Sequence, residues 1–115
     1  MITEDKKAAV LDALGEFVCF LNERSVTFTA ERHPGLEPCT YAVDGGRKYI
    51  RIVATSHGGS QHVHCFVDAQ TGGVYKAAGW KTPALNGERY SLLDPDSFAE
   101  LKGDWDPYGS YLYKR

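Results

Sequence analysis

The sequence lacks an apolar run long enough to cross a membrane, because no window approaches the ~18 uninterrupted apolar residues of a spanning segment. Its first ten residues, MITEDKKAAV, are charged and lack the apolar centre of a signal peptide. The two absences argue against a membrane partner. They favour a cytoplasmic protein.

Cysteine is scarce, and catalytic motifs are missing. Cys19, Cys39 and Cys65 make an odd number with no C-x-x-C spacing, which is typical of reduced thiols that serve as small core residues. We find no G-x-S-x-G, P-loop or dinucleotide fingerprint. We therefore expect a non-enzymatic protein without a cofactor.

Apolar content is not low: 43% of the residues are hydrophobic, enough for a packed core and above a disordered composition. The 115 residues have the size of one domain, so we expect a single domain over residues 1–115. Net charge is −2, but residues 46–81 alone carry +4, which leaves −6 for the rest of the chain. This basic stretch either attracts an anionic ligand locally or is a chance cluster on a solvated surface.

The same stretch predicts three consecutive antiparallel strands. Residues 48–54 and 61–67 alternate, and the turn at 68–72 has an Asp and a Gly placed to close a hairpin that pairs Val67 with Val74 and Phe66 with Tyr75. One predicted face is aliphatic, with Ile50, Ile52, Ala54, Val63, Cys65 and Val67. The opposite face carries Tyr49, Arg51, His62, His64, Phe66 and Tyr75.

The flanking segments supply the rest of an α+β fold. Five apolar residues at helical spacing (Val10, Leu14, Phe17, Val18 and Leu21) predict an amphipathic helix over about residues 4–23. Alternation predicts strands at 25–32 and 39–43. Asp94 and Pro95 begin a short helix, with Gly103 just beyond its end. We thus expect an N-terminal helix packed on a four- or five-stranded antiparallel meander, a short second helix and an aromatic C-terminal tail.

The aromatic and basic face is the candidate ligand-binding surface. Rings offer stacking and bases offer charge, a pairing that binds nucleotides and single-stranded nucleic acid. The candidate residues are Tyr49, Arg51, His62, His64, Phe66, Tyr75, Lys76, Trp80 and Lys81. Two alternatives stay open. Trp80 either plugs the core or stands out as a binding surface, and Trp105, Tyr108 and Tyr111 of the tail either leave this face open or cover it as a second core.

A metal site is the weaker hypothesis. His62 and His64 lie two apart on a strand, and zinc needs a third ligand, for which His57 is the candidate. Arg51, predicted on the same face, opposes a cation. We therefore expect no bound metal.

One segment resembles a known family. Residues 66–84, FVDAQTGGVYKAAGWKTPA, resemble a motif of small uncharacterised proteins of tailed bacteriophages, with weaker similarity at 47–53. Gly73 stands where those proteins often have an acidic residue, and Ala78-Gly79 where proline-containing variants occur. The resemblance implies a phage origin and the cytoplasm of an infected cell. It transfers no catalytic residue.

These observations give three functional hypotheses. The first is a non-enzymatic phage accessory protein that binds a host protein or a nucleotide-type anionic ligand. The second is a nucleic-acid-binding protein that uses the basic aromatic face. A metal-dependent hydrolase is the third and weakest.

Overall fold

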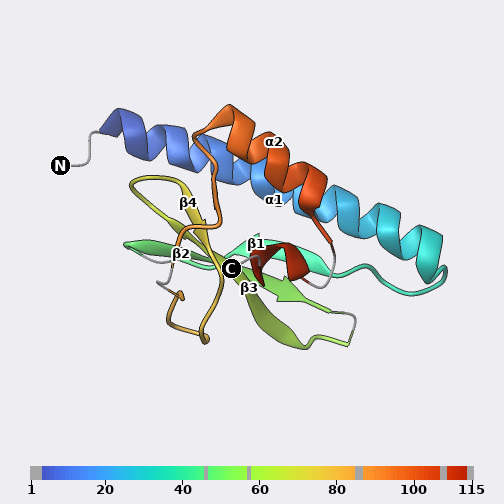
Figure 1. Cartoon of the computed structure of the whole chain (residues 1–115). Helices are drawn as coiled ribbons and strands as arrows, with labels where there is room; N and C mark the ends of the chain where they lie inside the picture. Colours follow the sequence, from blue (N-terminus) through green and yellow to red (C-terminus); the bar gives the residue numbers. More distant parts are fainter. Residues whose placement is uncertain (1–3, 46, 57, 85–86, 107–108, 114–115) are drawn as a thin grey trace.

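The computed structural model describes residues 4–45, 47–56, 58–84, 87–106 and 109–113. Two helices form one layer over a five-stranded antiparallel sheet, which confirms the expected α+β class (Figure 1). The elements are α1 (Glu4–Arg32), β1 (Thr40–Val43), β2 (Tyr49–Thr55), β3 (Gln61–Asp68), β4 (Gly73–Tyr75), β5 (Tyr90–Ser91), α2 (Pro95–Asp104) and a 3₁₀ helix, η1 (Ser110–Tyr113). The strands pair in chain order. Neither described α-helix has the length and apolar character needed to span a bilayer.

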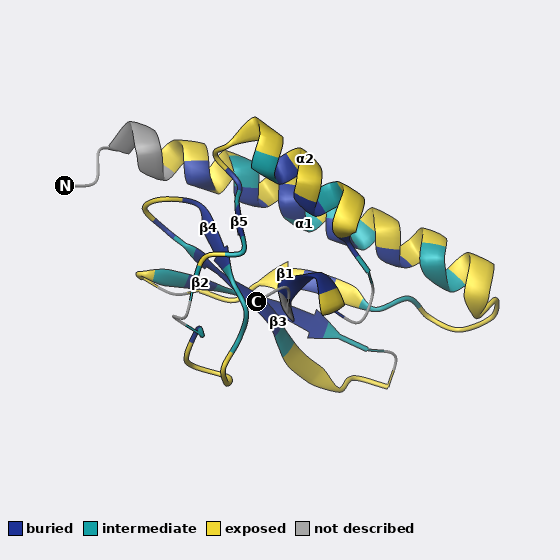
Figure 2. Cartoon of the chain, viewed as in Figure 1, coloured by how far each residue is buried: buried dark blue, intermediate teal, exposed yellow. Residues whose placement is uncertain are grey.

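The core lies between the helices and the face of the sheet turned toward them, called here the helix face (Figure 2). The predicted stripe of α1 faces this core, since Val10, Phe17 and Leu21 have no exposed surface, Leu14 has 3%, and Val18 is partly buried against the cluster. The same buried cluster contains Ile50 and Ile52 of β2 and Cys65 and Val67 of β3. Its members from α2 and the tail include Phe98, Leu101, Trp105, Tyr111 and Leu112. The shared helical and strand periodicity therefore produces the expected packing.

The predicted strand at 25–32 is wrong, because α1 continues through it to Arg32. Helical spacing extends past Leu21 to Ser25 and Phe28, and the buried Ser25 hydroxyl donates a 2.6 Å hydrogen bond to the carbonyl of Cys39. One turn earlier, the Asn22 amide both donates to and accepts from the backbone of Tyr41. These contacts tie the helix to β1 and outweigh the β-branched alternation.

The predicted faces of β3 are wrong in its first half, because β2 and β3 change register at a β-bulge between Ile52 and Val53. Ile52 pairs with Cys65, but Val53 pairs with Val63, which leaves His64 as the extra residue. Val63 therefore joins the face opposite the helices, called the second face, and is only half-buried. His62 pairs with the buried Ala54, and His64 points to the helix face.

The β3–β4 hairpin matches its prediction. Phe66 pairs with Tyr75 and Val67 with Val74. An Asp68 side-chain oxygen accepts hydrogen bonds from the backbone N–H groups of Gln70 and Thr71, at 2.7 and 3.2 Å, and Gly72 has a φ of 75°. The turn thus forms through the side-chain and glycine chemistry expected of it.

The described aromatic residues of the C-terminal part pack on the helix face, which decides against the alternative that they cover the second face. Trp105 is 9% exposed and Tyr111 is 3% exposed, and both belong to the core with α1. Tyr108 and the side chain of Tyr113 lie outside the described residues. Asp94 caps α2 as predicted, but the helix includes Gly103, and the fifth strand is β5 rather than 25–32.

Candidate functional site

A row of large side chains crosses the second face. Arg51 of β2 pairs with Phe66 of β3, which pairs with Tyr75 of β4. The ring of Tyr49 meets that of Tyr75 edge-on, with centroids 5.8 Å apart. Phe66 is 2% exposed, whereas Tyr49 and Tyr75 are half-buried. Four of the predicted residues therefore come together, with the two tyrosines at the accessible end.

Residues 76–84, called the Trp80 loop, continue from β4 as a closed excursion. The Lys76 carbonyl accepts a 2.7 Å hydrogen bond from the Ala84 N–H, and the Ala78 N–H donates to the Thr82 carbonyl at 2.9 Å. A bridge between Ala77 and Pro83 reinforces the base. These bonds hold the tip, where Trp80 is 43% exposed, so the ring stands out instead of plugging the core.

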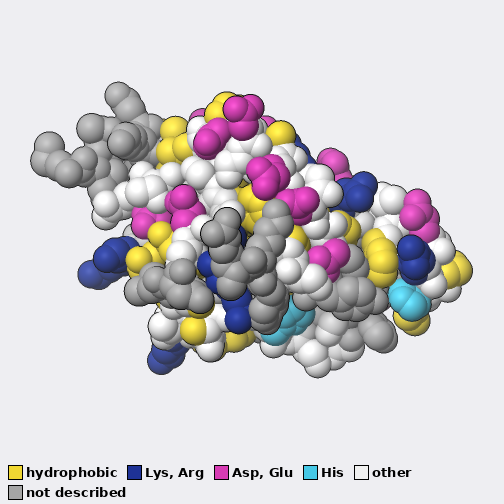
Figure 3. Space-filling model, in the orientation of Figure 1, with side chains coloured by type: hydrophobic (Ala, Val, Ile, Leu, Met, Phe, Trp, Pro, Cys, Tyr) yellow, Lys and Arg dark blue, Asp and Glu magenta, His cyan; other side chains and the backbone are white. Residues whose placement is uncertain are grey.

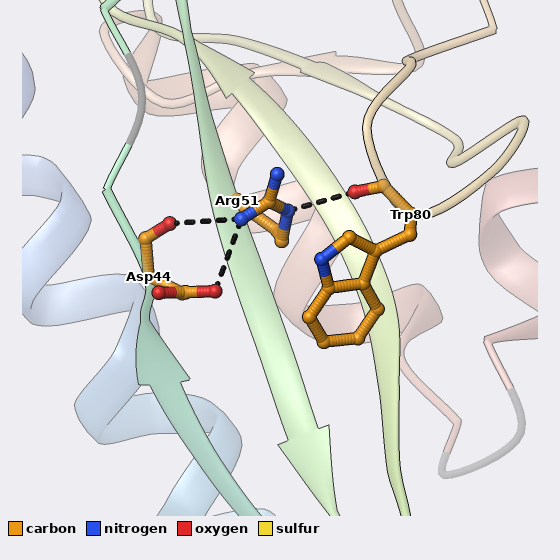
Figure 4. Close-up of polar contacts among 3 residues, drawn as sticks. All are labelled: Asp44, Arg51 and Trp80. Carbon is orange, nitrogen blue, oxygen red and sulfur yellow. Dashed lines mark hydrogen bonds and ion pairs between the residues drawn. The ribbon is translucent and has the colours of Figure 1, made fainter.

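Arg51 fixes this loop to the sheet (Figure 4). Its Nε–H donates a 2.7 Å hydrogen bond to the Trp80 carbonyl, and its guanidinium carbon lies 5.2 Å from the centroid of the Trp80 ring. On the other side, Nη1 forms a 3.0 Å ion pair with Asp44. Arg51 is thus a positioning residue for Trp80. Asp44 becomes part of the site through this ion pair and is not among the site residues predicted from the sequence.

The two histidines do not join the aromatic row. His62 is exposed, and His64 is buried with its Nε2 atom 2.6 Å from the Tyr111 hydroxyl. The His64 ring centroid also lies 5.0 Å from that of Tyr41. Burial lowers the pKa of His64 to about 4, with a smaller contribution from His62 in the same direction. His64 is therefore neutral at physiological pH.

Two adjoining hollows lie where β3 runs beyond β4, since β4 pairs only with Phe66 and Val67. The larger, the Trp80 groove, has a volume of about 330 Å³ and is lined by Gln61, His62, Val63, Ala77, Ala78, Gly79 and Trp80. The smaller, the histidine hollow, has about 100 Å³ and is lined by His62, Val63, His64, Lys76, Ala77, Gly109 and Leu112. The two hollows share three wall residues, His62, Val63 and Ala77, and are together called the trough. The trough unites the predicted residues His62, His64, Lys76 and Trp80, whereas Gln61 was missed because a strand-end amide carries no sequence signal.

Charge is distributed unevenly between the two layers. Acidic side chains gather over the helices, while several Lys and Arg side chains lie along the lower and left edges of the view, where the sheet is (Figure 3). Arg47, Lys48 and Lys81 are exposed. The Lys48 ammonium lies 5.6 Å from the centroid of the Tyr49 ring, next to the aromatic row.

Two features that would support catalysis are a reactive Cys65 thiol and a metal-binding cluster among the described residues. Burial raises the pKa of the Cys65 thiol, which lies on the helix face with no exposed surface and is therefore inert. The described residues contain no group of three or more His, Cys, Asp or Glu placed to hold a metal ion. His57, the candidate third ligand for zinc, lies outside the described residues.

The comparisons with known proteins place the chain in one family. No curated protein and no solved structure matches it. The profile described as "Family of unknown function (DUF7717)" matches residues 2–114, which is nearly the whole chain. The chain is therefore a member of the DUF7717 family.

Proposed function

We propose that this protein is a non-enzymatic binding protein that presents Trp80 to a nucleotide-type anionic ligand in a phage-infected cell. The observation that carries the proposal is an exposed ring that is held in place: Trp80 is 43% exposed, yet Arg51 binds its carbonyl and stacks against its ring. A fixed aromatic surface loses little conformational freedom when a flat ligand stacks on it. The resemblance of residues 66–84 to phage proteins supports the cellular context.

The surroundings of Trp80 suit a ligand with a ring and a negative charge. Lys81 follows it directly, and the Trp80 groove lies at the lower end of the ~300–1,000 Å³ range of small-molecule sites. The half-buried rings of Tyr49 and Tyr75 extend the aromatic surface. Neutral ligands would gain nothing from the bases, so charge should select among ring compounds.

Calorimetric titration of the protein with ATP and with a ten-residue single-stranded oligonucleotide tests the proposal, with the tryptophan fluorescence of the wild type as a second readout. Trp80 should respond because it is exposed, whereas Trp105 is 9% exposed. Trp80→Ala and Tyr75→Ala should each weaken binding by ~1–3 kcal/mol through lost stacking. The matched control is Leu36→Ala, which removes a 50% exposed apolar side chain outside this surface. The proposal fails if neither probe binds, or if Leu36→Ala weakens binding as much as Trp80→Ala.

Nucleic acid and a host protein are the other candidate partners of the same surface. Exposed Arg47 and Lys48 beside the tyrosines favour a strand of nucleic acid, whose affinity should fall steeply with salt. An exposed Trp packed on an Arg favours a protein, because these residues are enriched in interface hot spots. The salt dependence of oligonucleotide binding tests the first. A pull-down from infected host lysate with wild type, Trp80→Ala and Leu36→Ala tests the second.

A further inference from the structure

The trough joins two hollows of different size and chemistry. The Trp80 groove of about 330 Å³ has Trp80 and Gln61 among its lining residues. The histidine hollow of about 100 Å³ has Lys76, His62 and His64 among its own. A site of this second volume has room for only a few water-sized groups. It suits a single tetrahedral anion better than a purine ring system.

Three residues that line the histidine hollow have side chains able to donate hydrogen bonds. They are Lys76, the exposed His62 and the buried His64. The Nδ1–Cε1 edge of His64 faces Gly109, because a Cβ placed on that glycine would lie 3.7 Å from Cε1 and 4.0 Å from Nδ1. When the Tyr111 hydroxyl donates to Nε2, the hydrogen of the neutral imidazole is on Nδ1, toward the hollow.

An acidic group, Asp106, lies near His64 of this hollow. Asp106 is close enough to His64 to act on it electrostatically. Its two carboxylate oxygens accept the backbone N–H groups of Ser110 and Tyr111, both at 3.1 Å. Asp106 therefore holds the tail in place, and its charge is partly compensated by these bonds.

We propose that the trough binds a nucleoside monophosphate, with the base against Trp80 in the larger groove and the phosphate in the histidine hollow beside Lys76 and His62. The proposal deepens the proposed function and rests on it, since both place the ring on Trp80. It specifies the class of ligand and the orientation in which the ligand lies along the trough. A single phosphate fits the hollow, whereas a chain of phosphates must leave it.

Calorimetric titration with AMP, adenosine and inorganic phosphate tests this assignment. AMP should bind at least about tenfold more tightly than adenosine or phosphate alone, because it occupies both hollows. Lys76→Met and His62→Gln should each weaken AMP about tenfold by removing a charge-assisted hydrogen bond, and leave adenosine unchanged. Trp80→Ala should weaken both AMP and adenosine. Arg32→Met, which removes an exposed base at the end of α1 and outside the trough, is the control.

The outcomes separate this inference from the proposed function. AMP binding that needs Trp80 but is unaffected by Lys76→Met and His62→Gln overturns the phosphate site and leaves the proposed function standing. ATP or an oligonucleotide bound through Trp80 without measurable AMP binding does the same. Lys76→Arg keeps the charge and should restore affinity. Together with the melting curve of Lys76→Met, this variant shows whether weaker binding comes from the lost charge or from misfolding. Equal AMP affinity in Lys76→Met and Lys76→Arg contradicts the assignment.

Discussion

Lowering the pH from 7 to 4 should destabilise the fold, because it requires the buried imidazole of His64 to take up a proton. In the unfolded chain this group titrates at its ordinary pKa of 6.5, whereas burial lowers the pKa in the folded protein to about 4. Between these values only the unfolded state binds the proton, so acid favours unfolding. The contribution of neutral His64 to stability is present above pH 6.5 and is lost as the pH falls toward 4.

The size of the effect follows from that interval. Each pH unit over which only the unfolded chain is protonated contributes ~1.4 kcal/mol, so the interval from 6.5 to about 4 gives ~3 kcal/mol. A domain of this size has a free energy of unfolding of ~5–15 kcal/mol, so one histidine should account for a substantial fraction of the acid sensitivity.

Urea unfolding of wild type and His64→Gln at a series of pH values from 7 to 4 measures this contribution. Gln does not titrate and keeps a group able to bond with Tyr111, while the carboxylates contribute to both proteins alike. The difference between the two stability curves should change by ~3 kcal/mol across the series. The exposed His62, changed to Gln, should alter the curve far less. Parallel curves for wild type and His64→Gln would refute the reasoning.

The remaining predictions concern the core, the helix extension and a turn. Leu14→Ala should lower the free energy of unfolding by ~2–5 kcal/mol, whereas Leu11→Ala, at a 52% exposed position of the same helix, should change it by under ~0.5 kcal/mol; urea titration checks both. Ser25→Ala should cost ~1–3 kcal/mol because it leaves the Cys39 carbonyl without its 2.6 Å hydrogen bond, and a melting curve unchanged from wild type would contradict this. Gly72→Ala should cost at least ~1 kcal/mol in thermal unfolding, since its φ is 75° and the new Cβ would lie 3.0 Å from a leucine side chain.

The sequence predicted the structure correctly where the spacing of apolar residues and the turn residues indicated the same arrangement. The β3–β4 register was predictable because an Asp and a Gly define the turn and leave Phe66 opposite Tyr75. The buried stripe of α1 was predictable because its apolar residues recur at helical spacing. The end of α1 was not, because Ser25 is a polar residue whose burial depends on a carbonyl supplied by another segment.

The sequence predicted which residues belong to the candidate site better than it predicted how they are arranged. Alternation placed Tyr49 and Arg51 correctly, but the bulge reversed the faces of His62 and His64 relative to Phe66. A bulge leaves no clear mark in the sequence, since it inserts one residue without glycine or proline. The role of Arg51 was also hidden, because its contact with Trp80 joins segments that only the fold brings together.

The strand order of the sheet has a consequence for how fast the chain folds. Every described strand pairs with its neighbour in the sequence, so the loops closed by strand pairing are short except for residues 76–89 between β4 and β5. The entropy lost in each closure grows with loop length, and domains with local pairings reach their transition state sooner. We therefore expect refolding in the fast range for mixed α/β domains. The long α1 helix should dock late, because the sheet that covers its apolar stripe is made of residues that follow it in the chain.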